Sequence, residues 1–167
     1  MSKWVGRLQR GADVVATLLM ATMFASFIVQ VAARYVFNAP VSWADELSVI
    51  TGIWVILWAT SFCTRENENI RFDIIYTAVS PWMRRGFDVV TSLAFLIIFV
   101  GSFPAAWKYV AFMKIESTAA LHIRYDLVFS IYLIFAAAMI VRHSVLLWNA
   151  LHGRDQKPAS EIPLETD

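Results

Sequence analysis

Four stretches of the chain contain no Asp, Glu, Lys, Arg or His, and the charged residues gather between them. Three of these windows have eighteen residues or more, which is enough for a helix to cross about 30 Å of hydrocarbon. Their hydrophobic runs are too long for the strands or short helices of a soluble core. The four windows are Val14–Ala33, Leu47–Thr64, Val89–Trp107 and Leu127–Val141.

The fourth window has only fifteen residues, which is also typical of a buried helix in a soluble protein. Tyr125 and Trp148 flank it, as aromatic residues do at membrane interfaces. Asp126 and Arg142 can extend their polar groups to the interface from positions within the helix. We therefore predict a fourth span over about 125–147.

These windows predict an all-α integral membrane protein with four transmembrane helices and a short interfacial segment between the first two. The expected spans, about 14–33, 47–64, 89–107 and 125–147, form one domain over residues 1–152. The remainder, 153–167, contains two prolines and few large apolar residues, so we expect a disordered cytoplasmic tail.

Composition agrees with lipid as the solvent. The chain has 167 residues, of which 59% are hydrophobic and 16% charged, more apolar surface than a soluble domain of this size can bury. The net charge of +1, with basic residues scattered between apolar blocks, gives no reason to expect nucleic-acid binding. Cys63 is the only cysteine, which excludes a disulfide within the chain and a site built from several cysteines.

The basic N-terminus before the first window is also how a signal peptide begins. The twenty uncharged residues are too many for a signal core, however, and no small-x-small cleavage pattern follows at a fitting distance. We expect this segment to remain as the first span. Ten of the fourteen Lys and Arg residues then lie on the side of the two termini, which predicts that both ends are cytoplasmic.

The segment after the first window predicts a turn and a helix start. Asn38–Pro40 ends the first span, because proline disfavours helical geometry in the residue before it. Ser42 and Asp45 have the spacing of a capping box, in which each side chain accepts a backbone N–H of the other residue. Capping explains Glu46 less well, so it either pairs with Arg34 across the turn or faces a partner.

Weakly polar and aromatic residues mark helix faces. In the first span, Thr17, Ala21 and Ala25 form one small-residue stripe and Thr22, Ser26 and Gln30 form the next, which predicts close packing against a helix of this or another chain. Trp54 and Trp58 share a face of the second span and either face lipid, fill the bundle or bind a partner. Gly101, Ser102 and Pro104 predict a kink in the third span. The loop segment Ile70–Tyr76 mixes charged and large apolar residues, which is typical of a segment on the membrane surface and equally of a short cytoplasmic helix buried against a partner.

No window contains Asp, Glu, Lys, Arg or His, and Gln30 is the strongest polar group inside them. Pathways for charged solutes need such groups in the membrane. The chain is therefore not expected to conduct a charged solute alone. His122 is expected on one side of the membrane and His143 and His152 on the other, which disfavours haem between facing imidazoles. No cluster has the spacing of a metal or catalytic site, so we expect no cofactor, no metal and no enzymatic activity.

Arg34–Asn38 with Pro40, followed by Trp43, Glu46 and Leu47, resembles the signature of the small membrane subunit of TRAP transporters, the DctQ-like family. The resemblance covers nearly the whole chain. It implies a tripartite system in the bacterial inner membrane. A periplasmic binding protein captures an organic acid, a large membrane subunit moves it with sodium, and the small subunit is a scaffold for the large one.

On this resemblance, the permanent partner is the large membrane subunit, the transient partner is the periplasmic substrate-binding protein, and lipid covers the rest. The partner-contact candidates are Arg34, Tyr35, Trp43, Asp45, Glu46, Trp54 and Trp58. Two other functions stay open: a self-assembling small exporter or channel, and a haem or redox membrane anchor. An exporter would be expected to place an acidic residue inside a span, and none is present.

Overall fold

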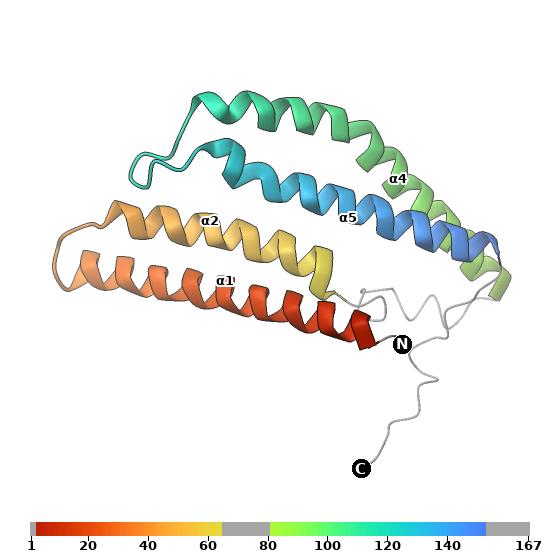
Figure 1. Ribbon diagram of the computed structural model, residues 1–167, viewed down its shortest axis with the longest axis horizontal. Coiled ribbons are helices and arrows are strands. Elements are labelled where there is room, and N and C mark those ends of the chain that lie inside the picture. The colour runs from red at the N-terminus through yellow and green to blue at the C-terminus, as the bar shows by residue number, and fades with distance from the viewer. Residues whose placement is uncertain (1–2, 65–80, 153–167) are drawn as a thin grey trace, which may run out of the picture. The chain divides into compact units, whose positions relative to one another are not determined.

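The computed structural model describes residues 3–64 and 81–152, and every regular element in these ranges is helical (Figure 1). The surface segment expected at Ile70–Tyr76 and the tail at 153–167 lie outside the described residues. The elements are α1 (Lys3–Tyr35), α2 (Ser42–Trp58), the π-helical turn η1 (Ala59–Cys63), α4 (Pro81–Phe112), the 3-10 turn η3 (Met113–Ile115) and α5 (Tyr125–Leu151).

Four helical segments in the described ranges are long and apolar enough to cross a membrane, which confirms the predicted all-α fold with four spans. They are Gly6–Tyr35, Ser42–Cys63, Arg85–Ile115 and Tyr125–Leu151. Each is longer than its uncharged window, because the helix continues through charged residues that can reach the interface. The ambiguous fourth window is the middle of α5, a helix of 27 residues.

The first predicted turn is present and has a defined mechanism. Asn38 has a positive φ of 50°, and the N–H of Ala39 donates to the carbonyl oxygen of Ala33 over 3.0 Å. This hydrogen bond closes a loop of seven residues through the left-handed Asn38 and gives one carbonyl group at the end of α1 a partner. Asparagine tolerates the left-handed conformation better than most residues, and Pro40 then prevents the helix from resuming at once.

The described residues fall into two compact units, each treated by itself below. Of the described residues, the first unit contains 3–63 and 103–138, and the second contains 64, 81–102 and 139–152. Within α4, the division falls between Ser102 and Phe103, one residue before Pro104. The α-helical assignment continues through that proline, so the predicted kink stays a prediction.

In the first unit, α1 and α2 run antiparallel and side by side (Figure 1). The less exposed positions of α1 repeat at alternating intervals of four and three residues, the spacing of a left-handed helix pair. These positions are Ala12, Ala16, Leu19, Met23, Ser26, Gln30 and Ala33. Most are small, which lets the two backbones approach closely where lipid provides no hydrophobic drive for association.

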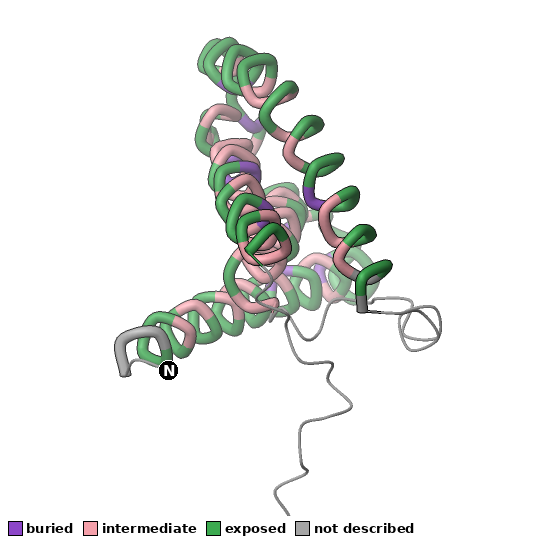
Figure 2. Tube along the Cα trace, turned by 90° about the vertical axis from the view of Figure 1, so that its right-hand side faces the viewer, coloured by how far each residue is buried: buried purple, intermediate pink, exposed green. Residues whose placement is uncertain are grey.

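The remaining surface of α1 is largely exposed and apolar (Figure 2). Leu18 and Phe24, for example, are 62% and 60% exposed. Of the two small-residue stripes, Ser26 and Gln30 lie on the α2-facing side, whereas Thr17, Ala21 and Ala25 are exposed. The helix that receives Ser26 and Gln30 is therefore in the same chain.

Candidate functional site

A polar cavity of about 140 Å³ lies at the turn between α1 and α2. It brings together three of the predicted site residues, Arg34, Asp45 and Glu46, with Gln30 from the α2-facing side of α1. Its lining consists of Gln30, Arg34, Pro40, Val41, Ser42, Asp45 and Glu46. The turn folds the polar end of α1 back onto the first helical turns of α2, which is why residues from both sides of Pro40 meet there.

The predicted capping box is wrong. The N-cap residue of α2 is Val41, with extended backbone angles and no side-chain capping hydrogen bond, so Ser42 is already inside the helix. The helix begins one residue earlier than the box requires, with Val41 as its N-cap directly after Pro40. The Asp45 carboxylate instead accepts a 2.7 Å hydrogen bond from Nε2 of Gln30. A tie between two helices is not visible in a local spacing pattern.

Glu46 contacts a part of the chain that the sequence did not associate with it. Its Oε1 accepts the backbone N–H of Ala120 over 2.8 Å, and its Oε2 accepts that of Leu121 over 2.9 Å. Both amides belong to the loop between η3 and α5. The alternative that Glu46 pairs with Arg34 is wrong among the described residues, since both carboxylate oxygens bind this loop and no ion pair joins the two side chains there.

The loop that Glu46 binds is a narrow hairpin. An antiparallel bridge joins Ser117 and Arg124, and the N–H of Thr118 donates to the carbonyl oxygen of Ile123 over 2.9 Å. The N–H of Ile123 donates in return to Oγ1 of Thr118 over 3.0 Å. His122 takes a positive φ of 53° at the tip, which closes the turn.

Arg124 and Asp126 form an ion pair where this hairpin enters α5. Nε and Nη2 of Arg124 donate to the two carboxylate oxygens over 3.0 and 2.5 Å. The hydrogen bonds from Arg124 to Asp126, and then the charge of that carboxylate, raise the pKa of Arg124 above its ordinary value. This ion pair joins the hairpin to the first turn of α5.

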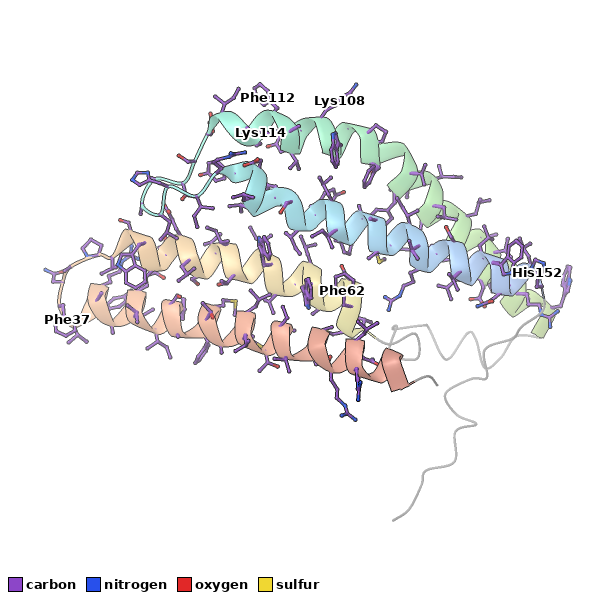
Figure 3. All side chains as sticks on the ribbon, viewed as in Figure 1. Phe37, Phe62, Lys108, Phe112, Lys114 and His152 are labelled. Atoms are coloured by element: carbon purple, nitrogen blue, oxygen red, sulfur yellow. The ribbon has the colours of Figure 1, made fainter. Side chains whose placement is uncertain are left out.

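Three predicted contact residues remain open to a partner. Arg34 and Tyr35 are exposed at the end of α1, Tyr35 to 78%, and Trp43 is 46% exposed in the first turn of α2. Phe37 lies at the turn itself and points away from both helices (Figure 3). This end of the first unit therefore presents aromatic rings beside a charged cavity.

The two tryptophans of the second span have partners inside the chain. Nε1 of Trp54 donates to the carbonyl oxygen of Val128 in α5 over 3.0 Å. Nε1 of Trp58 donates to that of Ala12 in α1 over 3.1 Å. Of the three alternatives for this face, namely lipid, the bundle interior and a partner, the bundle interior accounts for the hydrogen bonds of both indole N–H groups. The two side chains lie on one side of α2 yet contact different neighbouring helices.

The second unit contains polar contacts that the sequence analysis missed. A guanidinium N–H of Arg142 donates to the carbonyl oxygen of Thr64, which directly follows η1. His143 is 8% exposed, stacks on Phe95 with ring centroids 4.4 Å apart, and has no partner for Nδ1 among the described residues. The sequence signal for the burial of His143 was its spacing, because it follows the buried Ala136 by two helical turns and so lies on the same helix face.

The other two histidines occupy different surroundings. His122 is exposed at the hairpin tip, and His152 stacks on Trp148 at the end of α5. Within residues 3–64 and 81–152, no group of three His, Cys, Asp or Glu side chains is arranged to hold a metal ion. What the described geometry provides is a polar end for protein contacts and long apolar helix faces.

Among curated proteins, none is similar enough in sequence to serve as a relative. The family described as "Tripartite ATP-independent periplasmic transporters, DctQ component" matches residues 23–153. The match covers most of the chain, including the polar cavity, the hairpin and all of α2, α4 and α5. It also contains the Arg34–Leu47 segment that carries the resemblance seen in the sequence. The chain therefore belongs to the DctQ component family of TRAP transporters.

Proposed function

We propose that this chain is the non-catalytic scaffold subunit of a sodium-coupled TRAP transporter that imports an organic acid delivered by a periplasmic binding protein. The observation that carries this proposal is the distribution of charge along the spans. The four uncharged windows contain no Asp, Glu, Lys, Arg or His, so they offer a carboxylate substrate no cation. Transport of the acid is then the work of another chain.

The exposed face of α1 supports a permanent membrane partner. Large apolar residues such as Leu18, Phe24 and Ile28 cover the sides that α2 does not. Lipid can cover such a face, and so can a larger polytopic subunit, since small and apolar surfaces both pack well in the membrane. We assign this role to the large TRAP subunit and the rest of the apolar surface to lipid.

The contact surface that we propose at the turn is narrower than the sequence suggested. It comprises the exposed Arg34, Tyr35 and Trp43. Asp45, Glu46, Trp54 and Trp58 are left out of it because their polar atoms bind other parts of the same chain. With both termini cytoplasmic in the inner membrane, as the Lys and Arg distribution favours, this surface faces the periplasm and the binding protein.

The test is uptake by reconstituted vesicles. Vesicles with the large subunit and this chain, supplied with the binding protein and a sodium gradient, should accumulate the acid. Vesicles with this chain alone should not. Accumulation by this chain alone would overturn the scaffold role and favour a small exporter or channel. A tagged chain that purifies from its own host membranes only with copies of itself would also contradict it.

The contact surface is tested by a matched pair of charge substitutions. Arg34→Gln should weaken co-purification with the large subunit or binding protein and lower uptake several-fold, as truncation at an interface commonly does. Lys108→Gln removes an exposed cation from α4 (Figure 3) and should leave both unchanged. Equal behaviour of the two variants would remove Arg34 from the proposed surface while leaving the scaffold role intact.

A further inference from the structure

The tip of the α4–α5 hairpin directs two consecutive backbone N–H groups at one carboxylate. Ala120 and Leu121 donate to different oxygens of Glu46, at 2.8 and 2.9 Å. Successive amides that converge in this way form a nest, a concave arrangement of partial positive charge that binds anions without a basic side chain. No basic side chain contributes to these two hydrogen bonds.

The surrounding hairpin holds the two amides in position. Thr118 and Ile123 exchange hydrogen bonds on the near side of the tip, and the N–H of Tyr125 donates to the carbonyl oxygen of Glu116 over 3.1 Å at its base. The left-handed residue His122 sets the turn between them. Thr118 is buried at 5% exposure, so the base of the tip is packed as well as hydrogen-bonded.

We propose that this hairpin tip is a backbone carboxylate-binding nest and that Glu46 fills it, which makes Glu46 an internal positioning residue rather than a partner contact. The carboxylate joins the second turn of α2 to a loop 74 residues later in the chain. It thereby fixes where the exposed residues of the hairpin stand beside the polar cavity. The adjacent Asp45 has a different role, because its carboxylate binds Gln30 of α1.

A carboxylate-binding nest predicts effects of substitutions at Glu46 that a simple surface contact does not predict. A glutamine at position 46 offers one acceptor oxygen instead of two and turns an N–H₂ group toward an amide donor. An alanine leaves the two amides without their acceptor but leaves the hairpin itself unchanged. A small free carboxylate can then occupy the vacated nest, since the amides are held in place by the hairpin's own hydrogen bonds.

The experiment is amide hydrogen exchange on the full chain in lipid nanodiscs, followed by mass spectrometry of peptides covering residues 117–124. Glu46→Gln and Glu46→Ala should each speed exchange there by about tenfold or more, because the amides lose their protein acceptor. Asp45→Asn, the matched control one residue away, should leave it unchanged. Sodium formate should restore protection in Glu46→Ala, and sodium chloride at the same concentration should not.

Unchanged exchange in Glu46→Gln, or an equal rise in Asp45→Asn, would overturn the proposal. Protection that returns equally with chloride would overturn the carboxylate nest. If Glu46→Ala does not insert into the membrane, Glu46→Gln decides the question alone. The measurement uses this chain without its partners, so it does not rest on the proposed scaffold role. If wild-type protection appears only when the large subunit is present, Glu46 is a partner-dependent contact and the internal role is wrong.

Discussion

The two compact units of the chain solve the same problem, that of polar groups in a lipid environment, in different ways. In the first unit, polar side chains bind segments far away in the sequence: Glu46 binds the hairpin tip and Trp54 binds α5. In the second unit, Arg142 also binds a distant segment, at the carbonyl oxygen of Thr64, but His143 is buried against an aromatic ring and keeps one ring nitrogen without a partner among the described residues. Satisfied polar groups stabilise a membrane fold, whereas an unsatisfied one costs free energy.

We call the first unit a fixed platform, because hydrogen bonds between its helices and its hairpin hold them in one arrangement. Its hydrogen bonds tie α1 to α2 through Gln30 and Asp45, and α2 to α5 through Trp54. The Glu46 carboxylate adds the hairpin to the same assembly. A scaffold needs such a surface, because a loop that is already ordered loses less conformational freedom when a partner binds.

The largest effect in the first unit is expected at Trp54. Trp54→Ala removes a half-buried indole and its hydrogen bond to Val128, and should lower the free energy of unfolding by about 3 kcal/mol. Trp54→Phe keeps most of the ring and should cost only about 0.6 kcal/mol, the usual value for one hydrogen bond in a membrane protein. SDS-induced unfolding followed by circular dichroism measures both. Trp43→Ala, at an exposed site, is the control, and an equal loss there would contradict the platform.

Close helix approach is the second property of the first unit, and Gly52 tests it. A Cβ atom at Gly52 would lie 3.4 Å from Sδ of Met23 in α1, whereas one at Gly101 in the second unit would meet nothing within 4 Å. Gly52→Leu should therefore destabilise the protein by about 2 kcal/mol through overpacking between α1 and α2. Gly101→Leu, the matched control, should be neutral or stabilising, because leucine favours the helix over glycine.

The alanine substitution sharpens this test. Gly52→Ala places its methyl group in ordinary van der Waals contact with a flexible thioether, so it should change stability by no more than about 1 kcal/mol. A large loss in Gly52→Ala, or none in Gly52→Leu, would show that α1 and α2 do not approach each other at this point as described. The same SDS titration resolves the three variants.

The helices were predictable from sequence because lipid imposes a simple rule. A stretch without charges that is long enough to cross the bilayer must form a helix, since its backbone groups have no other partners. The windows therefore found all four helices, and the Asn38–Pro40 turn was visible in its residue types. The helix ends were less predictable, because residues such as Asp126 and Arg142 continue the helix that the window stops at.

The site was predictable only in part. The turn segment pointed to Arg34, Asp45 and Glu46, and all three line the cavity. Their bonding partners were not predictable, since Ala120 and Leu121 contribute backbone amides, which no side-chain pattern records. The capping box failed for a related reason. Its spacing was correct, but the helix began one residue earlier and Gln30 offered Asp45 a better partner.

The repeat along α1 was missed because its members are not conventional core residues. A search for an apolar heptad finds none, as Ala12, Ala16 and Ala33 are small and Ser26 and Gln30 are polar. In water, a contact between helices made by such residues is weak, whereas in lipid small residues favour close packing of helices. Hydroxyl groups on this side of α1 also find a hydrogen-bond acceptor within their own helix. Ser26, for example, donates to the carbonyl oxygen of Thr22 over 2.8 Å.

The smallest of the expected effects tests the second unit and has the opposite sign. His143→Phe retains a ring that can stack on Phe95 and removes a nitrogen that has no partner in the described part of the chain, so it should be neutral or stabilise the protein by about 1 kcal/mol. In the first unit, by contrast, loss of the Trp54 hydrogen bond is expected to destabilise. SDS unfolding of His143→Phe beside Trp54→Phe compares the two effects on stability directly.

A loss of stability in His143→Phe as large as that in Trp54→Ala would mean that the imidazole nitrogen has an essential partner, and the contrast between the units would fail. A gain would instead indicate that the histidine is kept at this position for a reason other than stability, because a phenylalanine would pack there at least as well.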